Sequence, residues 1–174
     1  MTQRTTPLVL RALACAAALA LAPHVTPAAT QDSVERKIHV PRGWEGAYDF
    51  GYAPLVRVGN WVIVSGIPAG GEGTYEDKVR RMYQRAKELL AEAGATIDDV
   101  VELTTFHVEP ADSAAFGQEF ARYMPIHREL FGEHRPAWTA IGGSVLLAPT
   151  AVVEMRVLAV IGSGTASEVV RGGD

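Results

Sequence analysis

The feature that most constrains the fold is the run at residues 152–160, which is apolar and rich in β-branched side chains but contains one acid, Glu154. Such a run predicts a strand buried within a sheet. A carboxylate in that environment costs free energy unless it has partners or takes part in chemistry. Glu154 is therefore predicted to act as a general base, to orient a water, or to pair with Arg156 or Arg135.

A second strand is predicted at residues 136–141, shortly before this run. Its sequence brings the indole of Trp138 and the hydroxyl of Thr139 toward the same part of the sheet. We interpret the two strands as parts of one site, with Glu154 as its acidic member.

A hairpin is predicted nearer the N-terminus. Residues 56–58 and 61–65 are short apolar segments separated by Gly59 and Asn60, a pair that tolerates the positive φ angles of a tight turn. Residues 31–42 are polar, and they predict an ordered lead-in or a short edge strand. A further strand is predicted at residues 100–108.

Two helices are predicted between the strands. Residues 74–93 carry apolar positions at helical spacing, with Thr74 as the N-cap. A second helix begins at Asp112 or Ser113, and Pro125 is interpreted as the start of a new helical piece.

This order of elements predicts an α+β fold, in which a single sheet carries both helices on one face. Two helices cannot cover both faces of such a sheet. The other face is therefore apolar and uncovered, which predicts an oligomer whose sheets pack together.

The N-terminal residues predict a secretory signal. Residues 12–22 form an apolar run of about eleven residues, which is the length of a signal-peptide core and too short to span a bilayer. We interpret residues 1–29 as the signal, residues 30–162 as the domain and residues 163–174 as a flexible tail; an uncleaved anchor is the alternative for the first segment. The predicted location is exported, either periplasmic or secreted, with no stable membrane insertion after the signal is removed.

Charge and cysteine usage narrow the function. The signal contains Arg4, Arg11 and the only cysteine, Cys15, but none of the 20 acids, so the net charge falls from −4 to −6 without it. The acidic excess and the lack of a basic patch argue against nucleic acid as a partner. Absence of cysteine from the mature chain excludes thiol nucleophiles and thiolate metal sites. The spacing of the histidines matches no zinc pattern, so no metal site is predicted.

Tyr52, Ser65 and Gly66 are the remaining candidate site residues. Tyr52 follows a glycine in an irregular segment, whereas Ser65 and Gly66 end a predicted strand and open a glycine-rich loop. Strand ends and the loops after them commonly carry binding and catalytic groups.

Taken in order, these features resemble the Rid family (reactive intermediate deaminases, also called YjgF/YER057c/UK114). The resemblance covers roughly residues 50–161. It is carried by Gly51-Tyr52, residues 62–66, 89–94, 99–101 and 104–106, the aromatic positions Phe116, Phe120 and Tyr123, and residues 135–137 and 153–155.

The resemblance implies a chorismate-mutase-like mixed sheet backed by two helices and a homotrimer with small-molecule pockets in the clefts between subunits. It also implies hydrolysis of enamines and imines, as in a 2-iminobutanoate/2-iminopropanoate deaminase, without a metal or organic cofactor. The family's Tyr, Ser and Glu fall on Tyr52, Ser65 and Glu154. Glu154 is expected to orient the water, whereas Gly66, Trp138 and Thr139 complete the expected binding site.

One departure from the family limits these implications. The archetype has an Arg directly after its Pro-Ala, where it grips the substrate carboxylate, and this chain has Trp138. An indole cannot form the bidentate ion pair of a guanidinium. The expected pocket is therefore more apolar, and the alternative function is a non-catalytic trimer that binds a small molecule.

Overall fold

The computed structural model describes residues 34–108, 110–165 and 167–173. The predicted signal at residues 1–29 lies outside these ranges. Among the described residues, no helix is long and apolar enough to cross a membrane.

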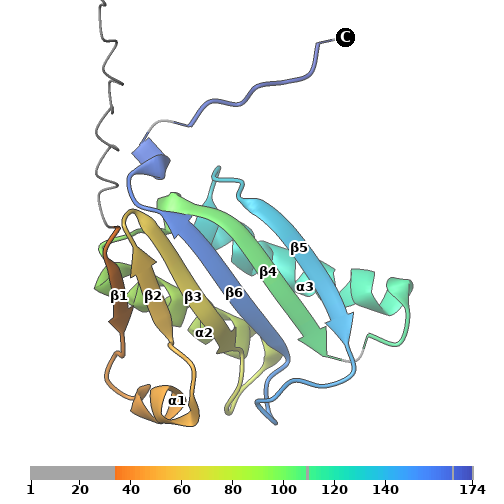
Figure 1. Ribbon diagram of the computed structural model, residues 1–174. Helices are drawn as coiled ribbons and strands as arrows, with labels where there is room; N and C mark the ends of the chain where they lie inside the picture. Colours follow the sequence, from red (N-terminus) through yellow and green to blue (C-terminus); the bar gives the residue numbers. More distant parts are fainter. Residues whose placement is uncertain (1–33, 109, 166, 174) are drawn as a thin grey trace, which may run out of the picture. The chain divides into compact units, whose positions relative to one another are not determined.

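A six-stranded mixed sheet forms the framework of the domain, in the order β1-β2-β3-β6-β4-β5. Only β4 and β5 run parallel, and every other neighbouring pair is antiparallel. Figure 1 shows β6 at the centre, between the N-terminal hairpin and the β4–β5 pair. The strands are β1 (Arg36–His39), β2 (Leu55–Val58), β3 (Trp61–Pro68), β4 (Val100–Val108), β5 (Ala137–Gly143) and β6 (Val153–Val160).

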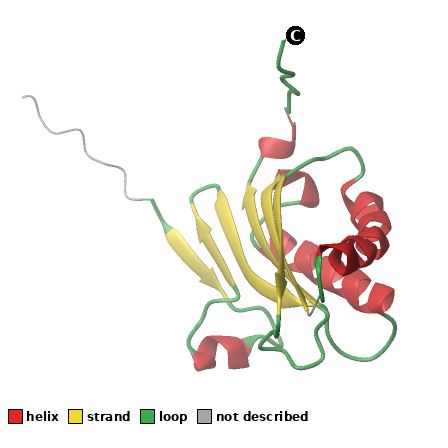
Figure 2. Cartoon of the chain, turned by 90° about the vertical axis from the view of Figure 1, so that its right-hand side faces the viewer, coloured by secondary structure: helices red, strands yellow, loops and turns green. Residues whose placement is uncertain are grey.

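Two long helices, α2 (Tyr75–Glu92) and α3 (Ser113–Phe131), lie on one face of the sheet (Figure 2). The predicted α+β architecture is confirmed. A short helix, α1 (Glu45–Phe50), lies beyond one end of the sheet and was not predicted. Thr74 caps α2 as expected, since its hydroxyl accepts from the Asp77 amide at 3.2 Å.

The prediction that Pro125 starts a separate helical piece is wrong, because α3 continues through it. Proline removes one backbone donor from a helix interior, which is a local cost. Tyr123 on one side of the proline and Ile126 and His127 on the other are buried against the sheet. Packing on both sides of Pro125 therefore holds the two segments as one helix.

The two faces of the sheet follow from the alternation along β6. Val153, Met155, Val157 and Ala159 are buried under the helices, whereas the residues between them are half-buried on the open face. No described helix covers this open face, on which Trp61 of β3 and Ile141 of β5 are 51% and 40% exposed.

Asp99 ties the end of β6 back to the sheet. It is buried at the end of the 3₁₀ helix η1 (Ile97–Asp99), and its Oδ1 accepts from the Gly162 amide at 2.8 Å and the Gly164 amide at 3.3 Å. The start of the predicted tail is thereby held in the second 3₁₀ helix, η2 (Ser163–Thr165). Residues 167–173 form no helix or strand.

We expect Asp99→Ala to lower the free energy of unfolding by about 2 kcal/mol at pH 7, the typical size for a lost charge-assisted hydrogen-bond network. Burial raises the pKa of the Asp99 carboxyl, but hydrogen bonds from Thr96, Gly164 and Gly162 outweigh it, so the net shift is downward. A carboxyl group whose pKa is lower in the folded protein than in the unfolded chain stabilises the fold at pH values above its unfolded pKa. This stabilisation is lost as the pH falls through the pKa of the folded state. The difference between variant and parent should therefore shrink below about pH 4.

Urea unfolding at a series of pH values measures this, with the exposed neighbour Asp98→Ala as the matched control. If Asp99→Ala lowers the free energy of unfolding by no more than Asp98→Ala does, the structural role given to Asp99 is contradicted.

Candidate functional site

A β-bulge places Ser65 and Gly66 at the centre of the candidate site. The register of β3 against β6 shifts between Val64 and Ile67, so Ser65 and Gly66 together face one residue of β6, Arg156. A bulge of this kind bends the strand and changes the direction of the side chains next to it.

The Glu154 carboxylate lies directly against Gly66. A Cβ atom built on Gly66 would be 2.1 Å from Oε1 of Glu154 and 2.7 Å from its carboxyl carbon. Any side chain at position 66 therefore displaces the carboxylate, and glycine is required for the observed position. The cross-strand neighbours of Glu154 are Pro68 of β3 and Phe106 of β4, which add no polar group.

Glu154 forms no hydrogen bond or ion pair with any residue in the described part of the chain. Of the alternatives for Glu154, pairing with an arginine is not seen within the chain: Arg156 lies 3.5 Å from Glu102, and Arg135 lies 3.4 Å from Glu133. Burial without a compensating partner raises the pKa of Glu154 above that of an ordinary glutamic acid. The site thus holds a half-buried carboxylate whose two oxygens have no hydrogen-bond or ion-pair partner among the described residues.

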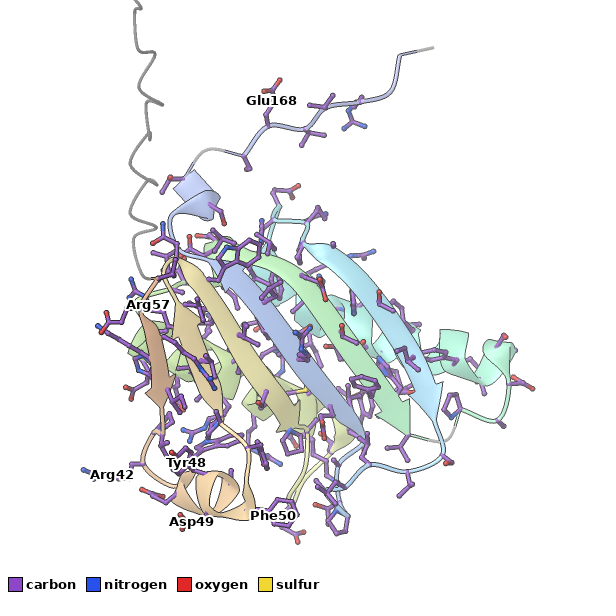
Figure 3. All side chains as sticks on the ribbon, viewed as in Figure 1. Arg42, Tyr48, Asp49, Phe50, Arg57 and Glu168 are labelled. Carbon is purple, nitrogen blue, oxygen red and sulfur yellow. The ribbon has the colours of Figure 1, made fainter. Side chains whose placement is uncertain are left out.

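Ser65 holds the segment that carries Tyr52. Its hydroxyl donates to the Ala53 carbonyl at 2.6 Å, and its amide donates to the Pro54 carbonyl at 3.0 Å. Tyr52 is 42% exposed, and its ring meets Phe50 edge-on at 6.4 Å. Phe50 ends α1 near the lower end of the sheet (Figure 3). The bulge therefore joins Ser65 and Gly66 to both Glu154 and the Tyr52 segment.

Trp138 lies on the other face of the sheet, among the helix residues. Its indole packs on His127 at 4.4 Å and on Phe120 at 5.0 Å, and its Nε1–H donates to the Thr105 hydroxyl at 3.0 Å. Within one chain, Trp138 and Glu154 therefore lie on opposite faces of the sheet, and a pocket that contains both needs a second subunit. Thr139, the next residue in β5, is exposed on the opposite side from Trp138.

Sequence reasoning missed a polar network under α3. His107 is fully buried, with Nδ1 2.9 Å from Glu119 Oε1 and Nε2 3.0 Å from the Thr105 hydroxyl. Tyr75 donates its hydroxyl to the same Glu119 oxygen at 2.9 Å. The available signal was the pair of polar residues at 105 and 107, which share the helix-covered face of a strand.

A second buried network lies beside it. The Tyr83 hydroxyl is 2.7 Å from the Tyr123 hydroxyl and 2.9 Å from Nδ1 of His127. Burial, with a smaller effect of nearby positive charge, lowers the pKa of His127 to about 4, so the ring is neutral at pH 7. Within the described ranges, no group of three or more His, Cys, Asp or Glu side chains is arranged to hold a metal ion.

Comparison with known proteins places this chain in a family. The family model described as Endoribonuclease L-PSP matches residues 48–161. The RutC family protein YjgH of Escherichia coli is 31% identical over 116 residues, which are 63% of this chain and 84% of that protein. The mitochondrial protein MMF1 of Saccharomyces cerevisiae is 29% identical over 116 residues, which are 63% of this chain and 74% of that protein.

A solved structure agrees with these matches. Rv2704 from Mycobacterium tuberculosis, described as a member of the YjgF/YER057c/UK114 family, has a TM-score of 0.63 at 27% identity and covers 73% of this chain and 100% of its own. The chain belongs to this family, the Rid family that the sequence features resemble.

We expect Gly66→Ala to move the Glu154 carboxylate away from the bulge while the fold is retained, because the clash falls on the end of a flexible side chain. The displaced carboxylate becomes better hydrated, so its pKa should fall toward the ordinary value. Titration of the Glu154 side-chain carboxyl by ¹³C NMR measures this shift. Gly117→Ala on α3, where an added Cβ meets nothing within 4 Å, is the control. An unchanged Glu154 pKa in Gly66→Ala would contradict the proposed packing.

Proposed function

We propose that this protein hydrolyses small reactive imines or enamines, or related carbonyl-derived metabolites, with Glu154 orienting the attacking water. The observation that carries the proposal is the unpaired, half-buried carboxylate held against Gly66. A raised pKa brings a carboxylate closer to the range in which a base both accepts and returns a proton at neutral pH. Family membership supports a function that involves small molecules.

The chemistry requires one base and no redox change. The water oxygen bonds to the imine carbon, and Glu154 takes the water proton as that bond forms. Glu154 then returns the proton to nitrogen, which gives the carbinolamine. Its hydroxyl proton passes to the nitrogen as the C–N bond breaks, so ammonia leaves and the carbonyl compound remains. One imine and one water thus give one carbonyl compound and one ammonia.

Tyr52 and Ser65 are the proposed binding groups. The Ser65 hydroxyl already donates to the Ala53 carbonyl, so its oxygen remains available to accept from an imine N–H. The phenol of Tyr52 is partly exposed and can donate to the substrate. Gly66 leaves room for the Glu154 carboxylate next to Ser65, because a Cβ atom at position 66 would lie 2.1 Å from Oε1 of Glu154.

A homotrimer is part of the same proposal. Glu154 and Thr139 belong to the open face of the sheet, whereas Trp138 belongs to the helix face, so a cleft that includes all three needs residues from two subunits. The open face carries exposed apolar side chains on β3 and β5, which favours its burial against another copy. We also propose export of the mature chain, supported by the composition of residues 1–29.

A non-catalytic trimer that binds a small molecule is the second candidate. Trp138 favours this candidate, because it stands where the family archetype has its substrate-binding arginine. Its indole donates to the Thr105 hydroxyl and packs on His127. Arg135, the nearest arginine in sequence, donates to the Gly132 and His134 carbonyls. A carboxylate-bearing imine therefore lacks the expected cationic clamp.

Glu154→Gln is expected to lower the rate of ammonia release from freshly generated 2-iminopropanoate by at least about 100-fold, the typical effect of losing a general base. The activity of the parent should fall as the pH is lowered through the Glu154 pKa, because only the ionised form accepts a proton. Glu102→Gln, on the same open face and paired with Arg156, is the matched control. Equal activity in parent and Glu154→Gln would remove the mechanism, and ligand-induced thermal stabilisation without product would support the binder.

Leu158→Lys is expected to convert the trimer to monomer, because it places a charge at the centre of the open face. Light scattering coupled to size exclusion should give three times the chain mass for the parent and one chain mass for the variant. Val170→Lys, 85% exposed beyond η2, is the control. A monomeric parent would contradict the proposed assembly.

A further inference from the structure

A hollow on the helix side of the sheet lies apart from Glu154, between the first turns of α2 and α3. Its volume is about 400 Å³, within the range of small-ligand pockets. Apolar residues form most of its wall, and the polar groups come from Tyr75 and Glu119. The lining residues are Tyr75, Val108, Pro110, Ala115, Glu119, Ala151 and Val152.

Glu119 supplies the carboxylate of this hollow, and its side chain is 18% exposed. Both hydrogen bonds that the structure gives it fall on Oε1, one from the Tyr75 hydroxyl and one from Nδ1 of His107, each at 2.9 Å. Burial and the adjacent Glu119 charge raise the pKa of Tyr75, which keeps the phenol a donor. Oε2 of Glu119 has no partner among the described residues.

His107 links Glu119 to two further side chains. Its Nδ1 lies 2.9 Å from Oε1 of Glu119, and its Nε2 lies 3.0 Å from the Thr105 hydroxyl, which accepts from the indole N–H of Trp138. Both His107 and Tyr75 therefore contact the same oxygen of Glu119, and Oε2 is left for a ligand.

The positive side chains near this hollow have other partners. Arg122 pairs with Glu76 at 2.9 Å and lies over the Tyr75 ring, and Lys78 donates to the Thr150 carbonyl. Within the residues that the structure describes, the basic side chain within 4.0 Å of the Glu119 carboxylate is His107, whose Nδ1 lies 2.9 Å from Oε1, and no Lys or Arg nitrogen lies that close. A partly buried anion in an apolar hollow favours a cationic ligand.

We propose that this hollow binds a small primary ammonium compound with a short aliphatic group. The ammonium donates to the free Oε2 of Glu119, and the aliphatic group packs against Val108, Ala115 and Val152. A compact ammonium suits this carboxylate, because its charge-assisted hydrogen bond to Oε2 is stronger than one from a neutral donor. The inference does not depend on chemistry at Glu154, which lies on the opposite face of the sheet.

The test is an NMR titration of the parent with isobutylammonium chloride at constant pH and ionic strength, with isobutanol as the uncharged isostere. We expect saturable shifts of the Val108, Ala115 and Val152 amides with the ammonium probe and at least tenfold weaker binding of the alcohol. The Trp138 indole N–H should also shift, because it is joined to Glu119 through Thr105 and His107.

Glu119→Gln keeps an acceptor for Tyr75 and His107 but removes the charge of the carboxylate. It should therefore weaken binding of the ammonium probe at least tenfold. Glu129→Gln, further along α3 and paired with Arg80 on the surface, should bind as the parent does. Ala115→Leu fills part of the hollow while the carboxylate is kept, and it should also abolish binding. This second variant decides the question if Glu119→Gln does not fold. Absence of saturable binding in the parent, or parent-like binding in Ala115→Leu, overturns the proposal.

Discussion

The close packing of the Glu154 carboxylate on Gly66 is the contact on which the candidate site depends. It exists because β3 gains an extra residue against β6 at the Ser65–Gly66 bulge, and because glycine leaves the space that a Cβ atom would fill. The same bulge lets Ser65 reach the Ala53 carbonyl and fix the segment next to Tyr52. One irregularity in one strand therefore places Ser65 against the segment next to Tyr52 and Gly66 against Glu154.

The face of the sheet on which this carboxylate lies is set by the alternation of side chains along β6. Along β6 the alternate residues Val153, Met155 and Val157 enter the core, so Glu154 faces the open side. A carboxylate on the core side would need a buried partner, such as the donors that His107 and Tyr75 supply to Glu119 under α3. The sheet thus separates two carboxylates in different environments. Glu119 lies beneath the helices and has hydrogen-bond partners, whereas Glu154 lies on the open face and has none among the described residues.

Local pattern was enough to predict most of the framework. The hairpin around Gly59-Asn60, the capped helix after Thr74 and the central strand around Glu154 all depend on short-range signals. The short helix α1 was missed because none of its six residues has a buried side chain, so its sequence shows no periodic pattern of apolar residues. Continuity of α3 through Pro125 depends on packing against the sheet, which no local signal reports.

The relative placement of the site residues depended on pairing that a single segment does not encode. Trp138 and Glu154 belong to strands that are not neighbours, and β4 between them fixes which residues share a face. A shift of one residue in that pairing would exchange the faces. Family resemblance identified Tyr52, Ser65 and Glu154 as positions of interest, but the direction of the Trp138 indole required the register.

The central claim is that the Glu154 carboxylate stays free of protein cations and is available to water in the assembled protein. A high-resolution crystal structure of the assembly tests this directly. Our account predicts an ordered water within hydrogen-bonding distance of the Glu154 carboxylate, above Gly66 and beside Tyr52. An arginine or lysine from a neighbouring subunit paired with Glu154 would contradict it, because the carboxylate would then be a structural ion-pair partner.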